Sequence, residues 1–128
     1  MSLVLVVDDD SDVRQILRAF IELEGHRVIE ACDAVEARAL LAREAVDLVL
    51  LDAVMPGESG PSLCHALKED PRTRDLKVVI LTGHDGEPSW REGLQSGADV
   101  FALKPANQAR IRMLLQELLP PPNGNPGP

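Results

Sequence analysis

Several polar residues stand immediately after short apolar runs of the sequence, and their carboxylate, hydroxyl and ammonium groups could act together. They are Asp8, Asp9, Asp10, Asp52, Thr82 and Lys104. Carboxylates drawn into one crevice repel one another unless a cation neutralises them, and Mg²⁺ favours one or two carboxylates with water and phosphate oxygens. The hydroxyl and the ammonium are then donors for an oxyanion. The combination predicts a site for phosphoryl transfer to a carboxylate.

The apolar runs that precede these residues are predicted strands. The five runs in the sequence are Leu3–Val7, Arg27–Ala31, Asp47–Leu51, Lys77–Leu81 and Asp99–Leu103. Four of them are continuous and rich in Val, Leu or Ile, as expected of strands covered on both faces. Arg27–Ala31 is more polar and is followed by no residue of this kind, which is typical of an edge strand away from the site.

The segments between the runs have helical periodicity. The first predicted helix ends at Gly25, where a helix C-terminus favours glycine, and Asp33 is predicted to cap the second. Pro61 and Pro88 suit the first turns of the third and fourth helices, and Asn107 can cap the last. Strict alternation of strand and helix predicts an α/β fold, with a parallel sheet covered by helices on both faces. Ligands of such sheets bind beyond the carboxyl ends of the strands, so we expect the polar residues to meet there.

The composition excludes several classes of protein. The chain has 128 residues, of which 45% are hydrophobic and 27% charged, as expected of one ordinary domain. Its formal net charge of -8, from 13 Lys+Arg against 21 Asp+Glu, opposes phosphate backbones and anionic lipid, so we expect no direct binding to nucleic acid or membranes. Because Cys32 and Cys64 have no motif spacing and no apolar run is long enough to span a membrane, we expect a cytoplasmic location.

The last nine residues differ from the rest of the chain. Residues 120–128 are rich in Pro and Gly and have no apolar side chain to bury, so they cannot continue the last helix. They are either a disordered tail or the start of a linker to a further domain after residue 128. The folded domain is predicted to span residues 1–119.

The chain resembles the receiver domains of two-component response regulators, those of chemotaxis among them, from about Leu3 to Leu119. The segments that carry the likeness are, in chain order, Val6-Val7-Asp8-Asp9, Asp47-Leu48-Val49-Leu50-Leu51-Asp52, Met55-Pro56-Gly57 with Gly60, Leu81-Thr82-Gly83, Gly97-Ala98-Asp99 and Lys104-Pro105. Each segment alone is weak, but together, in this order and spacing, they are specific. The resemblance implies the flavodoxin-like receiver fold, a doubly wound five-stranded parallel sheet in the order 2-1-3-4-5 flanked by five helices.

The resemblance also implies a phosphoacceptor and a metal site. Asp52 is the implied phosphoacceptor. Asp9, Asp52 and the backbone carbonyl of Val54 are the implied ligands of Mg²⁺ or Mn²⁺, and Asp8 acts through bound water.

Three further residues have implied roles after phosphorylation. Lys104 pairs with the phosphoryl oxygens, and Thr82 moves inward to donate a hydrogen bond to them. That movement frees space for Phe101 to turn inward. The face formed by the fourth helix, the fifth strand and the fifth helix then changes its partner preference.

The implied function is a phosphorylation-activated switch and not an enzyme, since it catalyses only its own phosphoryl transfer and autodephosphorylation. The implied phosphodonor is a sensor histidine kinase or a phosphotransfer protein. The implied target is an output domain or effector protein, and phosphorylation-dependent dimerisation belongs to the same expectation. The alternative is an interaction-only receiver that binds a partner without being phosphorylated.

Other polar or aromatic residues have ordinary structural interpretations. Asp10 is predicted to be solvated or to cap a helix, and Trp90 to pack partly on the fourth helix. His84, two residues after Thr82, stands where the family varies and where access of hydrolytic water is influenced. His26 and His65 are predicted to be surface histidines.

Overall fold

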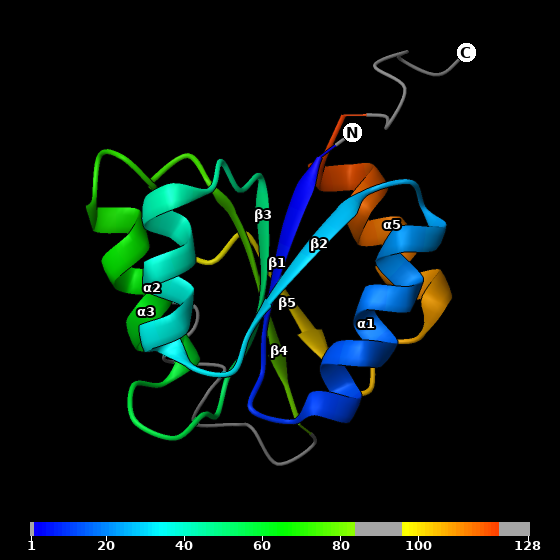
Figure 1. Ribbon diagram of the computed structural model, residues 1–128, viewed down its shortest axis with the longest axis horizontal. Helices are drawn as coiled ribbons and strands as arrows, with labels where there is room; N and C mark the ends of the chain where they lie inside the picture. The colour runs from blue at the N-terminus through cyan, green and yellow to red at the C-terminus, as the bar shows by residue number, and fades with distance from the viewer. Residues whose placement is uncertain (1, 84–95, 121–128) are drawn as a thin grey trace.

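The computed structural model describes residues 2–83 and 96–120, which contain one five-stranded parallel sheet in the order β2-β1-β3-β4-β5 (Figure 1). The elements in chain order are β1 (Leu3–Val7), α1 (Ser11–Leu23), β2 (Arg27–Ala31), α2 (Ala34–Arg43), β3 (Leu48–Asp52), α3 (Gly60–Glu69), β4 (Lys77–Thr82), β5 (Val100–Leu103) and α5 (Gln108–Leu118). The predicted α/β class and strand order are confirmed, and β2 is an edge strand as expected. The fourth predicted helix, with Pro88 and Trp90, falls on 84–95 and lies outside the described residues.

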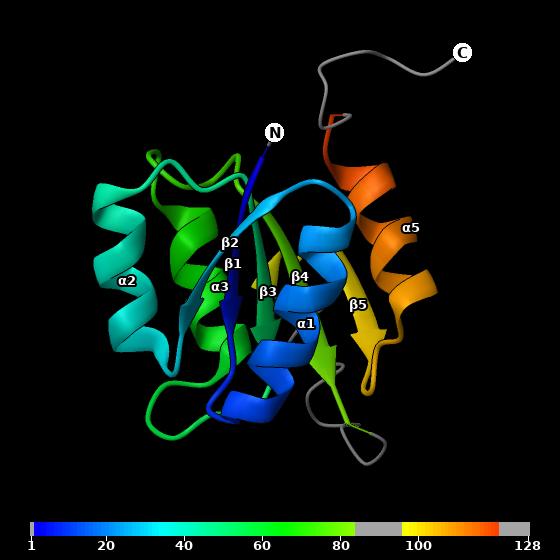
Figure 2. The same ribbon diagram turned by 45° about the vertical axis from the view of Figure 1, so that its right-hand side comes forward.

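Helices cover both faces of the sheet (Figure 2). Successive strand residues point to opposite faces and so belong to two different cores. On β1, Leu5 and Val7 belong to the core shared with α2 and α3. Val4 and Val6 belong to the core shared with α1 and α5. Every residue of β1, β3 and β4 except Lys77 is therefore buried, which explains why these runs are continuously apolar.

The helix termini follow the predicted signals. Asp33 caps α2 by accepting a hydrogen bond from the backbone N–H of Glu36, and Asn107 caps α5 by accepting one from Arg110. Gly25 has a φ of 89° directly after the C-cap of α1, a backbone conformation that favours glycine. Pro61 lies in the first turn of α3. These local signals determine where the elements begin and end.

Two strands begin one residue later than predicted, and the aspartate before each of them binds a neighbouring strand through its carboxylate. Asp47 accepts a hydrogen bond from the backbone N–H of Leu3 at 2.8 Å. Asp99 accepts one from the backbone N–H of Val78 at 2.8 Å and pairs with Lys68. Both carboxylates act at the amino-terminal edge of the sheet, far from the polar residues at the other edge.

The prediction of a surface position for His26 is wrong, whereas His65 is exposed as expected. His26 is 6% exposed, and its Nδ1 accepts a hydrogen bond from the backbone N–H of Ser2 at 3.3 Å. Burial lowers the pKa of this imidazole. The ring is therefore an uncharged acceptor that fixes the start of β1 against β2.

Across residues 2–83 and 96–120, no helix combines the length and the apolar character that crossing a bilayer requires.

Candidate functional site

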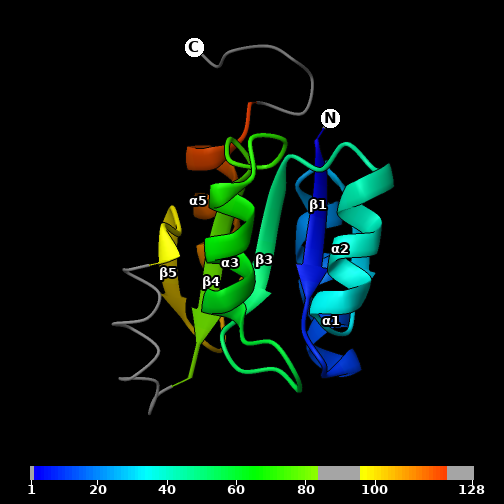
Figure 3. The ribbon, with the colours of Figure 1, turned by 90° about the vertical axis from the view of Figure 1, so that its left-hand side faces the viewer.

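The carboxyl ends of the parallel strands lie at one edge of the sheet (Figure 3). The polar residues noted in the sequence gather at this edge. Asp8 directly follows β1, Asp52 ends β3, Thr82 ends β4 and Lys104 directly follows β5. Strand pairing extends slightly beyond these ends, because the backbone N–H of Lys104 donates to the carbonyl of Thr82 at 2.7 Å. The sheet therefore places side chains from four strands side by side.

Three of these side chains form an acidic cluster, defined here as Asp8, Asp9 and Asp52. One carboxylate oxygen from each lies within 4.8 Å of the others. Asp8 and Asp52 are buried, at 2% and 7% exposure, and Asp9 is exposed. An all-oxygen set open on one side suits a hard divalent cation that keeps some of its water, so the cluster fits Mg²⁺.

Lys104 binds two members of the acidic cluster at once. Its Nζ donates to Oδ2 of Asp8 at 2.7 Å and lies 3.0 Å from Oδ1 of Asp52. The family resemblance implied only phosphoryl oxygens as partners of this lysine, and its contact with the carboxylates was not predicted. The ammonium thus neutralises part of a charge cluster that would otherwise be costly to bury.

The cluster also changes how its members bind protons. Burial raises the pKa of Asp52, and the neighbouring Asp8 adds to this, while Lys104 opposes it. For Lys104, burial acts to lower the pKa, but hydrogen bonds to Asp8 and Asp52 outweigh it and raise the pKa. Lys104 is therefore a permanently charged partner of the cluster at neutral pH.

Thr82 contributes a buried hydroxyl that has no hydrogen-bond partner within residues 2–83 and 96–120. The residue is 1% exposed. A buried hydroxyl without a partner costs free energy, so such groups in native structures call for an explanation. Here the hydroxyl is an available donor at the same sheet edge as Asp52.

The segment after β3 approaches the sheet closely. The backbone N–H of Val54 donates to Oδ1 of Asp52 at 3.4 Å, and the Val54 side chain is 71% exposed. A Cβ added at Gly60 would lie 2.2 Å from the backbone oxygen of Asp52. Glycine at this position therefore lets the start of α3 pack against the residue that carries the central carboxylate.

Phe101 and the start of α5 border a surface hollow of about 390 Å³. Phe101 is half-buried and packs against the core shared with α2 and α3. Ala106 and Arg110 line the same hollow. Phe101 therefore lies near the surface formed by β5 and α5. His84, for which the sequence predicted an influence on the access of water, lies outside the described residues.

Two neighbours of the cluster have supporting positions. Asp10 caps α1, since its carboxylate accepts from the backbone N–H groups of Asp12 and Val13, as the capping interpretation predicts. Arg14 of α1 donates to the backbone carbonyl of Asp8 and pairs with Glu30 of β2. Neither Arg14 nor Glu30 was among the predicted site residues. The available signal was Glu30 itself, a charged residue inside a predicted strand.

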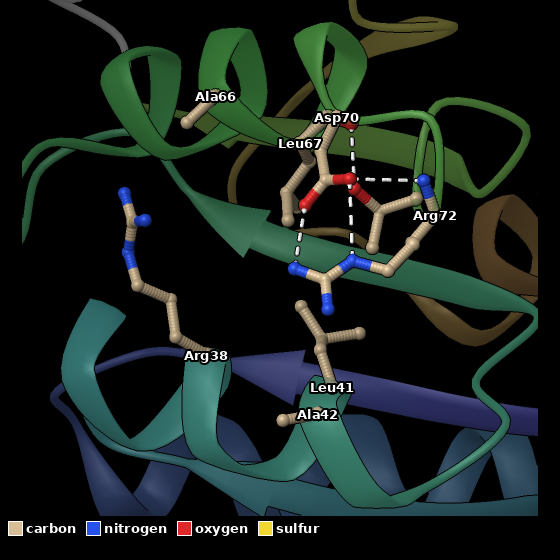
Figure 4. Close-up of a pocket in the computed structure, with 8 residues that line it drawn as sticks. Arg38, Leu41, Ala42, Ala66, Leu67, Asp70 and Arg72 are labelled. Carbon is tan, nitrogen blue, oxygen red and sulfur yellow. Dashed lines mark hydrogen bonds and ion pairs between the residues drawn. The ribbon is translucent and has the colours of Figure 1, made fainter.

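A larger hollow of about 410 Å³ lies between α2 and α3 (Figure 4). None of the residues that line it belongs to the acidic cluster. We call it the α2–α3 hollow; it is lined by Arg38, Leu41, Ala42, Ala66, Leu67, Asp70, Arg72 and Thr73. Its two guanidinium groups are paired within the chain, Arg72 with Asp70 and Arg38 with Glu58. The hollow therefore presents charges that are already balanced.

Comparison with known proteins gives a consistent family. A model described as "Response regulator receiver domain" matches residues 4–116. Response regulator PleD of Caulobacter vibrioides is 41% identical over 115 residues, which cover 87% of this chain and 25% of PleD. The phosphate regulon transcriptional regulatory protein PhoB of Pseudomonas aeruginosa is 33% identical over 116 residues, which cover 91% of this chain and 51% of PhoB. The chain thus spans about a quarter of one relative and half of the other.

Solved structures agree with this similarity. The receiver domain of NtrX from Brucella abortus has a TM-score of 0.83 and 30% identity, covering 91% of this chain and 97% of that one. Chemotaxis protein CheY4 of Vibrio cholerae has a TM-score of 0.85 and 28% identity, covering 93% of this chain and 99% of that one. Both comparisons cover more than nine-tenths of this chain.

Proposed function

This chain belongs to the family of response regulator receiver domains, and on that premise we propose that it is a phosphorylation-activated switch with Asp52 as the phosphoacceptor. The observation that carries the proposal is the acidic cluster with its two donors. The Lys104 ammonium binds Asp8 and Asp52, and the Thr82 hydroxyl is buried without a partner in the described residues. A buried nucleophilic carboxylate beside two hydrogen-bond donors that can bind phosphoryl oxygens suits phosphoryl transfer.

The metal site uses residues of the same edge. Asp9, Asp52 and the backbone carbonyl of Val54 would hold Mg²⁺ or Mn²⁺, and Asp8 would act through bound water. When bound, the ion supplies positive charge that offsets both the nucleophile and the phosphoryl group. Because one carboxylate oxygen of each of Asp8, Asp9 and Asp52 already lies within 4.8 Å of the others, little rearrangement of the chain is needed to present them.

The chain's own residues then act in sequence. A carboxylate oxygen of Asp52 forms a bond to phosphorus as the phosphorus–nitrogen bond of a phosphohistidine breaks, and the electron pair leaves with the imidazole of the donor. Lys104 gives up its contact with Asp52 and pairs with the new phosphoryl oxygens. The Thr82 hydroxyl moves inward and donates to them. Each donor thereby gains an acceptor that the unphosphorylated chain does not offer it.

The output follows from the movement of Thr82. Phe101 turns inward into the space that Thr82 leaves, and this changes the surface of β5 and α5, where the 390 Å³ hollow lies. A sensor histidine kinase or phosphotransfer protein supplies the phosphoryl group. An output domain or effector protein reads the changed surface, and a phosphorylation-dependent dimer is one form of that output.

The test is an intact-mass measurement after incubation with Mg²⁺ and acetyl phosphate. We expect the parent to gain the mass of one phosphoryl group. No such gain is expected in the presence of EDTA or for the Asp52→Asn variant. Asp75→Asn is the matched control, because Asp75 is an exposed carboxylate before β4, at the other edge of the sheet. An Asp52→Asn protein modified as well as the parent would exclude Asp52 as the acceptor.

A parent that gains no phosphoryl group is then tested for binding of beryllofluoride, a phosphoryl analogue. Binding would indicate that the chain accepts the phosphoryl group only from a protein donor, a sensor histidine kinase or a phosphotransfer protein. Failure to bind would favour the interaction-only receiver, in which Lys104 neutralises the acidic cluster permanently.

A further inference from the structure

Arg14 connects the end of β1 to the edge strand β2. Its Nη1 donates to the backbone carbonyl of Asp8 at 2.7 Å, and its Nε pairs with Oε1 of Glu30 at 3.0 Å. The Arg14 side chain is only 18% exposed. A planar guanidinium can make both contacts at once, which a lysine ammonium in the same place could not do with the same geometry.

Glu30 is in turn held from two sides. Its second oxygen, Oε2, accepts from Nε of Arg18, one turn further along α1, at 2.6 Å. Burial acts to raise the pKa of Glu30, but hydrogen bonds and charge from Arg18 and Arg14 outweigh it and lower the pKa. The carboxylate is therefore ionised at neutral pH and fixed against the first two turns of α1.

This connection reaches the acidic cluster through the main chain of Asp8. The Asp8 backbone N–H donates to Ala31 of β2 at 3.1 Å, while its carbonyl accepts from Arg14. Its side chain accepts from Lys104 and from the backbone N–H of Asp10. The short turn between β1 and α1, which carries Asp8 and Asp9, is thus held at its first residue by contacts in three directions.

We propose that Arg14, anchored by Glu30, is a positioning residue that pre-organises Asp8 and Asp9 for the divalent cation. This inference rests on the proposed function, because it requires that the acidic cluster bind Mg²⁺. Mg²⁺ demands near-ideal octahedral geometry, so a small displacement of its ligands weakens binding. Residues that orient metal ligands from behind typically change affinity by about 10- to 100-fold when they are removed.

The charge of Arg14 predicts the opposite effect and so makes the test decisive. If Arg14 acted only as a nearby positive charge, its removal would strengthen binding of a cation to the acidic cluster. If it positions the turn, its removal weakens binding despite that charge. The sign of the change therefore separates the two roles.

The experiment is a calorimetric titration of the full 128-residue chain with Mg²⁺, combined with the rate of modification by acetyl phosphate. We expect Arg14→Gln and Glu30→Gln to weaken the Kd for Mg²⁺ about tenfold. We expect Arg14→Lys, which keeps the charge but not the fork, to weaken it by a similar factor. Glu22→Gln is the matched control for Glu30→Gln, because it also removes one negative charge that pairs with Arg18, but on the exposed side of α1. Its Kd for Mg²⁺ should stay within about twofold of the parent's.

A second readout separates positioning from general loss of structure. In Arg14→Gln the Mg²⁺ concentration for half-maximal modification should rise about tenfold, while the rate at saturating Mg²⁺ stays near that of the parent. An unchanged or tighter Kd in Arg14→Gln overturns the inference, whatever the Kd of Glu30→Gln, and leaves the proposed function intact. A parent that neither binds Mg²⁺ nor becomes modified overturns both.

Discussion

Charged side chains line two regions of the molecule, the acidic cluster at the carboxyl edge of the sheet and the α2–α3 hollow. The hollow is the more obvious concavity, with a volume of about 410 Å³, and both of its arginines are paired with carboxylates. The Arg72 side chain is also well solvated, since it is 88% exposed. The acidic cluster instead buries two carboxylates beside one ammonium and one hydroxyl without a partner in the described residues.

The difference shows that shape and charge alone do not mark a functional site. Exposed pairs in the hollow are screened by water and contribute little free energy. Buried like charges are costly, so a fold that keeps them must use them or compensate them. The following predictions test whether the two regions differ in this way.

The largest difference is expected from removing one cation in each region. Lys104→Met leaves Asp8 and Asp52 without their ammonium, so we expect the free energy of unfolding without Mg²⁺ to fall by about 3 kcal/mol. The Kd for Mg²⁺ should become tighter by about fivefold or more, because a competing positive charge is gone. Arg72→Met in the hollow should change the free energy of unfolding by less than about 0.5 kcal/mol. Urea unfolding measures the free energy of unfolding, and calorimetric titration measures the Kd for Mg²⁺. An equal loss of unfolding free energy in Lys104→Met and Arg72→Met would contradict the expected difference between the two regions.

Enlarging a small residue in each region should give the next largest effect. Gly60→Ala places a Cβ against the backbone oxygen of Asp52, so the start of α3 must shift, at a cost of about 2 kcal/mol. Ala66→Leu extends into open space of the α2–α3 hollow and should change stability by less than about 0.5 kcal/mol. Thermal unfolding of the two variants measures the difference, and a stable Gly60→Ala protein would show that this close approach is not required.

Replacing one threonine in each region should change stability with opposite signs. Thr82→Val removes a buried hydroxyl that has no partner in the described chain, so the free energy of unfolding should rise by about 1 kcal/mol without Mg²⁺. The Thr73 hydroxyl donates to the carbonyl of Leu67 at 2.6 Å. Thr73→Val should therefore lower the free energy of unfolding by about 1 kcal/mol. Chemical denaturation gives the two signs. A destabilised Thr82→Val protein would indicate that this hydroxyl already has a partner.

The smallest expected difference is in pH dependence. Burial and the nearby Asp8 raise the pKa of Asp52, so its contribution favours the fold below its unfolded pKa and is lost as pH rises through its folded pKa. Hydrogen bonds from the Arg72 backbone and side chain lower the pKa of Asp70, so its contribution is present above the unfolded pKa and is lost as pH falls through the folded pKa.

Two variants measured at two pH values test these opposite signs. From about pH 4 to about pH 7, Asp52→Asn should gain stability relative to the parent, and Asp70→Asn should lose it. Urea unfolding in EDTA measures both differences. The same sign in the two variants would show that burial does not separate the two aspartates.

Much of the fold could be predicted because its signals are local in the chain. The continuous apolar runs predict strands covered on both faces, and β1, β3 and β4 are almost entirely buried. Caps such as Asp33 and Asn107 bind backbone groups three residues away, so they can be recognised without knowing the rest of the molecule. The gathering of Asp8, Asp52, Thr82 and Lys104 also follows, since all of them stand at the ends of parallel strands.

The strand–helix alternation, the capped helix termini and the sheet edge at which the polar residues meet could therefore all be predicted from the amino-acid sequence. The pairing of distant side chains could not be predicted, because it depends on how the elements pack. Lys104 binds Asp8, which lies 96 residues away in the chain, and His26 is buried. Glu30 forms an ion pair with Arg14, whereas the polarity of its strand had indicated only an edge position in the sheet. Side-chain type and periodicity are properties of neighbouring residues, whereas partners and burial depend on packing between distant segments.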